Sequence, residues 1–154
     1  MDQHLTSQSS TVFRSCHSLI YIFDVESEQL LTSDVHYFIK CLAALKAQNP
    51  ETGADGAAGP TVYVLLHKMD LISDAEQKTR FSEFEANVRK RTTELGWKGG
   101  LAFFGTSIWN ETLYKVSTRS SLSMSDWPRV LALAQMYHFR ARCDVVAFED
   151  SVSV

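Results

Sequence analysis

The chain has 154 residues, of which 45% are apolar and 21% charged, and its formal net charge is −3. This length suits one domain with or without a fragment of a second, and the composition is that of a globular protein. The slightly acidic charge argues against a nucleic-acid-binding face and against a polybasic membrane anchor. No apolar run reaches the roughly 18 residues of a membrane span, and the first ten residues lack the apolar core of a secretory signal.

The three cysteines, Cys16, Cys41 and Cys143, are widely spaced and form no CxxC pair. We interpret them as reduced thiols of a cytosolic protein. The histidines are also scattered, and the neighbours Cys16 and His17 cannot alone build a tetrahedral site. We therefore expect no metal site.

Strand-like and helix-like segments alternate along the chain. Residues 19–25 form a short apolar run, which is typical of a strand covered on both faces. The segment 49–60 is rich in glycine, alanine and proline and predicts a surface loop. Between them, apolar residues recur at three- and four-residue steps and predict a helix that ends at Asn49-Pro50: Val35, Phe38, Ile39, Leu42 and Leu45.

A second strand is predicted at 61–66, followed by a long helix. Ser73 precedes Glu76 by three residues, which is the spacing of a capping box. The helix is predicted over 75–95 and ends at Gly96, a common helix stop. Its apolar face is formed by Phe81, Phe84, Val88 and Leu95.

A third strand is predicted at 101–104, and a further helix at 111–116. Successive strand–helix units indicate an α/β fold with a parallel sheet and right-handed crossovers. Ligands of such sheets bind beyond the carboxyl ends of the strands. The residues that follow each strand are therefore the candidate site residues.

The segments after the second and third strands have the chemistry to recognise guanine. Asp70, in the string HKMD, offers two acceptor oxygens to the two parallel N–H donors of the guanine edge, which adenine lacks. Lys68 can lay its aliphatic stem along a flat base, and His67 can hold the loop by hydrogen bonding. Backbone N–H groups near Ser107 and Ile108 can donate to the guanine O6 atom.

Other polar and aromatic residues have simpler interpretations. Asp24 ends the first strand, where receiver domains carry a phosphorylated aspartate, but the acidic pair and lysine of those domains are not evident. We interpret Asp24 as a turn residue. We expect Trp97, Trp109 and Trp127 to pack in the core or against helices rather than to anchor a partner.

The strings LIYIFDVESEQL, HKMDL and TSIWNETLYK resemble the Rag-type small GTPases, the RagA/RagB-like branch of the Gtr/Rag family. The resemblance is strongest at 19–31 and 61–116. Residues 6–15 are similar to the segment that follows the second switch of this family. Residues 144–150 resemble the first strand of its roadblock-like dimerisation domain.

The resemblance implies a partial P-loop NTPase fold, with a small GTPase-like parallel sheet and flanking helices but without the P-loop half. Residues 1–124 would be the C-terminal half of the G domain. Residues 125–154 would be the start of the roadblock-like domain, so that the chain is truncated at both ends. The guanine-binding residues would be His67, Lys68, Asp70, Ser107 and Ile108.

The phosphate-binding groups of this fold are missing from the sequence. No GxxxxGK[ST] motif is present, and the family's switch threonine and DxxG loop would precede Met1. We identify no catalytic residue and no metal ligand. GTP or GDP is implied as ligand, with Mg²⁺ only in full-length family members. We expect this chain to bind GTP very weakly or not at all, and not to hydrolyse it.

A folding consequence follows from the missing half. The strand at 19–25 would lose its neighbour and become an exposed apolar edge, which favours aggregation. We therefore expect the chain to be poorly soluble when it is produced alone.

The resemblance also implies partners and a location. These are a RagC- or RagD-like second subunit in a heterodimer, and a scaffold at the vacuole or lysosome that passes amino-acid status to TOR complex 1. The chain would be cytoplasmic and peripheral to that membrane, with the nucleus as a further location. Two alternatives stay open: a non-catalytic interaction fragment or decayed copy without nucleotide binding, and a gene model that lost its 5′ exons.

Overall fold

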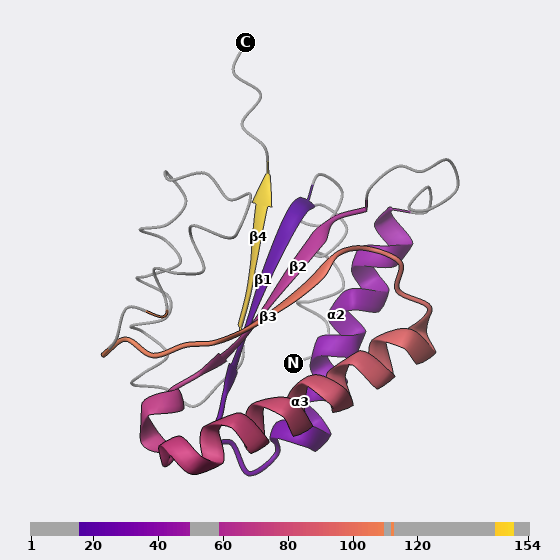
Figure 1. Ribbon diagram of the computed structural model, residues 1–154. Helices are drawn as coiled ribbons and strands as arrows, with labels where there is room; N and C mark the ends of the chain where they lie inside the picture. The colour runs from indigo at the N-terminus through magenta and orange to yellow at the C-terminus, as the bar shows by residue number, and fades with distance from the viewer. Residues whose placement is uncertain (1–15, 50–58, 110–111, 113–143, 150–154) are drawn as a thin grey trace.

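The computed structural model describes residues 16–49, 59–109, 112 and 144–149. Its centre is a four-stranded sheet in the order β3-β2-β1-β4 (Figure 1). The strands are β1 (Cys16–Asp24), β2 (Thr61–His67), β3 (Leu101–Gly105) and β4 (Asp144–Glu149). The pairs β1–β2 and β2–β3 are parallel, which confirms the predicted α/β class with a parallel sheet.

Two long helices, α2 (Val35–Gln48) and α3 (Asp74–Leu95), pack on one face of this sheet (Figure 1). The short π-helix η1 (Leu30–Asp34) leads into α2, and the short 3-10 helix η2 (Met69–Leu71) follows β2. The predicted strands and the first two predicted helices are therefore present. Of the predicted helix at 111–116 only Thr112 lies within the described residues, and of the predicted loop only residues 50–58 fall outside them.

The core forms where the apolar helix faces meet alternate residues of β1 and β2. Every second residue of β1 from Leu19 contributes to this core, and so do Val62, Val64 and Leu66 of β2. The intervening residues Ile20 and Ile22 are also at most 2% exposed. A strand buried on both faces is what the continuous apolar run predicts.

The helix ends follow the sequence signals with one difference. Gly96 closes α3 in the left-handed conformation, at φ 73°, as a C-terminal glycine does. At the other end, the Ser73 hydroxyl donates to the Glu76 carboxylate at 3.0 Å and does not accept a backbone N–H. The capping-box prediction therefore places the helix start correctly but is wrong about the hydrogen bond.

The expectation of an exposed edge at β1 is wrong. β1 lies between β2 and β4, and β4 pairs with it antiparallel, with Ile20 opposite Val146. The backbone groups of β1 are thus paired on both sides, and the aggregation argument built on a bare β1 no longer applies. The assignment of 125–154 to a separate domain stays a prediction, although 144–149 lies in this sheet.

Candidate functional site

The carboxyl ends of β1, β2 and β3 meet at one edge of the sheet. The register places Asp24 opposite His67 and Leu66 opposite Gly105. Backbone hydrogen bonds continue past the strands: Thr106 N–H donates to Leu66 O at 2.9 Å, and Met69 N–H donates to Thr106 O at 3.1 Å. The two loops that the sequence singles out are therefore tied side by side.

His67 joins these loops from within. Its ring is 1% exposed, and its Nδ1 atom forms a hydrogen bond of 3.0 Å with the Thr106 hydroxyl, which is fully buried. This bond connects the end of β2 to the residue after β3. His67 therefore holds the loop, and its burial makes it a support of the site rather than part of its surface.

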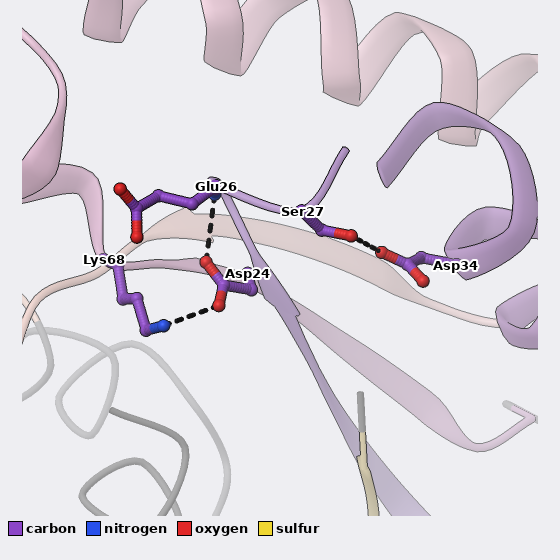
Figure 2. Close-up of polar contacts among 5 residues, drawn as sticks. All are labelled: Asp24, Glu26, Ser27, Asp34 and Lys68. Carbon is purple, nitrogen blue, oxygen red and sulfur yellow. Dashed lines mark hydrogen bonds and ion pairs between the residues drawn. The ribbon is translucent and has the colours of Figure 1, made fainter. Parts of the chain in front are cut away.

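Lys68 follows in an unusual backbone conformation. Its φ of 63° is the one positive φ of a non-glycine residue within the described ranges. Its ammonium group donates to Asp24 Oδ2 at 2.6 Å, and the two side chains are 9% and 10% exposed (Figure 2). Asp24 Oδ1 accepts the Glu26 N–H at 2.9 Å, the bond expected of a turn-forming aspartate.

Asp70 and Ser107, 37 residues apart in sequence, meet directly. The Ser107 hydroxyl donates to Asp70 Oδ1, and the same hydroxyl oxygen accepts the Trp109 N–H at 3.1 Å. Asp70 is exposed, whereas Ser107 is fully buried. The serine thus fixes the orientation of an acidic group at the surface of the sheet edge.

The backbone amides of the loop that follows β3 are partly engaged. Ser107 N–H donates to the Thr112 hydroxyl at 3.0 Å, so this amide bonds within the loop in the structure. Ile108 is half-buried and follows directly. The structure thus brings together all five predicted guanine-binding residues at one edge, and whether they contact a base stays a prediction.

Two residues of this edge were not predicted as site residues, namely Asp24 and Thr106. Asp24 ends β1 and Thr106 follows the end of β3, and this position at the carboxyl edge of the sheet is the sequence signal that could have identified them. The packing prediction for Trp109 is wrong, because its side chain is 72% exposed. Trp97 does pack against the core cluster, and Trp127 lies outside the described residues.

Two of the pockets that described residues line lie near α2 and α3. One of about 310 Å³ lies beside the candidate site, with Met69, Asp74, Gln77, Lys78, Phe81, Gly105 and Thr112 as its lining. A larger one of about 540 Å³ lies at the carboxyl ends of α2 and α3 and is lined by residues within 43–49 and 95–98. Among the described residues no cluster of three or more metal-ligating side chains is present, and no helix could span a membrane.

The three parallel strands β1–β3, with helices on one face and paired polar loops at their carboxyl ends, are consistent with a partial small GTPase-like α/β fold. The chain belongs to the Gtr1/RagA G protein family, whose conserved region matches residues 1–146.

Named relatives agree with this assignment. The chain is 38% identical over 115 residues to Ras-related GTP-binding protein B of Rattus norvegicus, covering 75% of this chain and 27% of that protein. It is 35% identical over 115 residues to GTP-binding protein GTR1 of Saccharomyces cerevisiae, covering 75% and 34%. It is 30% identical over 152 residues to Ras-related GTP-binding protein A of Dictyostelium discoideum, covering 99% and 45%. The chain thus spans less than half the length of these relatives and is a partial region of their domain.

Proposed function

We propose that this chain provides the guanine-recognition loops of a Rag/Gtr-type GTP-binding protein. The observation that carries the proposal is the junction of Asp70 and Ser107. An exposed carboxylate is held by a buried serine hydroxyl at the carboxyl edge of a parallel sheet. A carboxylate so oriented can accept the ring N–H and the exocyclic amine of guanine as a bidentate pair.

The ligand of this site would be the base of GTP or GDP. The relatives are named as GTP-binding proteins, which supports this choice. Phosphate binding in such folds uses a glycine-rich loop at a helix N-terminus, and the 154 residues contain no such motif. We therefore expect base recognition without tight phosphate contacts, and hence weak binding. Mg²⁺ would be bound only in full-length family members, because its ligands are not among these 154 residues.

The remaining family roles are part of the same proposal. The protein would be one half of a heterodimer with a RagC- or RagD-like subunit and would act in amino-acid signalling to TOR complex 1. It would sit at the vacuolar or lysosomal surface through a scaffold. Co-purification of the tagged chain with such a subunit tests the partner, and absence of the pair from the eluate would refute it.

The test of base recognition is a titration of the ¹⁵N-labelled chain with nucleosides, followed by NMR. We expect guanosine to shift the amides of residues 67–70 and 106–109 at millimolar concentration, and adenosine to leave them unchanged. Asp70→Asn replaces one acceptor oxygen by an NH₂ donor. It should weaken guanosine binding and favour xanthosine, whose 2-oxo group accepts a hydrogen bond. Glu83→Gln, on the exposed side of α3, is the matched control.

A non-catalytic interaction fragment is the second candidate function. It is favoured by the engagement of one expected base-contacting group inside the protein, the Ser107 N–H, which donates to the Thr112 hydroxyl. Equal responses to guanosine and adenosine, unaltered by Asp70→Asn, would select this candidate and overturn base recognition.

A further inference from the structure

The ion pair between Lys68 and Asp24 joins two strand ends that are 44 residues apart in sequence. The parallel register sets their distance, because Asp24 stands opposite His67 and Val25 N–H donates to His67 O at 3.1 Å. Lys68 is the next residue after His67. The Lys68 side chain therefore begins beside the end of β1, within reach of the Asp24 carboxylate.

The backbone of Lys68 makes that turn. A φ of 63° lies in the left-handed region, which residues with a Cβ adopt rarely and which persists where the surroundings impose it. The buried Asp24 carboxylate is bonded to the side chain of this residue. Figure 2 shows Asp24 between the Lys68 ammonium and the backbone of Glu26, with one carboxylate oxygen bonded to each.

The cation of Lys68 is therefore neutralised inside the protein. Both charged side chains are about nine-tenths buried, and a charge at that depth is retained when it is paired. The carboxylate offsets the charge of the ammonium group bonded to it, which weakens the attraction of that group for a phosphate. About 9% of the Lys68 side chain stays exposed to a ligand, and its four-carbon stem is the apolar part that suits the face of a base.

We infer that Asp24 is a positioning residue of the candidate guanine site: it neutralises Lys68 and fixes its aliphatic stem as a platform for the base, so that Lys68 contributes to base binding and not to phosphate binding. This inference rests on the proposed guanine-recognition role. It assigns the ring face of the base to the Asp24–Lys68 pair and leaves the base edge to Asp70.

The test is a double-mutant cycle on the full chain, with guanosine affinity measured by the NMR titration. Asp24→Asn keeps an acceptor for the Glu26 N–H but sets an NH₂ group against the ammonium. Lys68→Met keeps an apolar stem but leaves the Asp24 carboxylate without its cation. We expect each single variant to bind guanosine about tenfold more weakly, and the double variant, which has no unbalanced charge, to return within about threefold of the unaltered chain.

A titration with inosine distinguishes a positioning role of Asp24 on Lys68 from a general disruption of the guanine site. Inosine lacks the exocyclic amine that Asp70 would accept, so the ratio of guanosine to inosine affinity reports the base edge alone. We expect Asp24→Asn to lower both affinities equally and to leave this ratio unchanged, whereas Asp70→Asn lowers the ratio. Glu26→Gln removes an exposed carboxylate two residues away and should change neither quantity.

Three results would overturn the inference: unchanged guanosine affinity in Asp24→Asn, a double variant as weak as the singles, or a ratio that falls in Asp24→Asn as in Asp70→Asn. If Asp24→Asn does not fold, Lys68→Met and the double variant decide alone, and no recovery in the double variant refutes the pair. If the unaltered chain does not respond to guanosine, the proposed function and this inference fall together. If Asp70→Asn behaves as proposed and Asp24→Asn binds normally, this inference alone falls.

Discussion

Removing the hydroxyl of Thr106 should destabilise the protein through His67. The Thr106 side chain is fully buried, and its Oγ1 lies 3.0 Å from Nδ1 of a ring that is 1% exposed. Thr106→Val keeps the shape and deletes the hydroxyl, so the imidazole loses this partner in a site that water does not reach. Loss of a buried hydrogen-bonding partner costs about 1–3 kcal/mol, and we expect about 2 kcal/mol.

For a chain of this length each kcal/mol lowers the melting temperature by about 2–4 °C, so Thr106→Val should melt about 4–8 °C below the unaltered chain. Thr106→Ser is the matched control. It keeps the hydroxyl and removes one buried methyl group, which costs about 0.8 kcal/mol. Circular dichroism at 222 nm during heating, with calorimetry to check two-state unfolding, measures both.

The relative melting temperatures of Thr106→Val and Thr106→Ser test whether the hydrogen bond stabilises the protein. If the hydrogen bond to His67 stabilises the loop junction, the serine variant is the more stable of the two. A valine variant that melts at or above the serine variant would refute this reasoning, because burial of the methyl group would then outweigh the hydrogen bond.

Three further outcomes follow from the fold. Phe23→Ala should lower the free energy of unfolding by about 4 kcal/mol in urea titrations, because the Phe23 ring is fully buried and its centroid lies 4.9 Å from that of the Phe84 ring. A loss below about 1 kcal/mol would contradict this packing. Gly96→Ala should cost about 1 kcal/mol in the same assay, because φ is 73° and the new Cβ would stand 3.3 Å from a lysine Nζ; an unchanged midpoint would argue against the left-handed cap. Burial raises the pKa of Cys41 from 9.0 to about 11, so the neutral thiol favours the folded state below pH 9 and this contribution is lost as pH rises toward 11. With the other cysteines replaced by serine, alkylation at pH 8 should be roughly a hundredfold slower in the folded chain than after denaturation, and equal rates would refute the burial.

The order of the elements could be read from local patterns. The run at 19–25 and the periodic face of Phe84 and Val88 are local signals, and each corresponds to a strand or a buried helix face in the structure. Gly96 at the end of α3 is a signal of the same kind. Such patterns are reliable because burial of one face repeats with the period of the element itself.

The candidate site was predictable in position but only partly in its bonds. A parallel sheet predicts that the polar residues after β2 and β3 lie side by side. The hydrogen bond between Ser107 and Asp70 confirms this. The side-chain partners did not follow. Periodicity says nothing about the left-handed turn at Lys68 or about the use of the Ser107 amide by Thr112.

The sequence by itself determined the α/β class, the family and the two loops that carry the guanine hypothesis. Only the tertiary structure decided that β4 covers β1, that Trp109 faces solvent, and that Asp24 binds Lys68. The reason is physical. Secondary structure depends on residues within one or two turns, whereas a strand neighbour or a buried ion pair depends on which distant segments the sheet brings together.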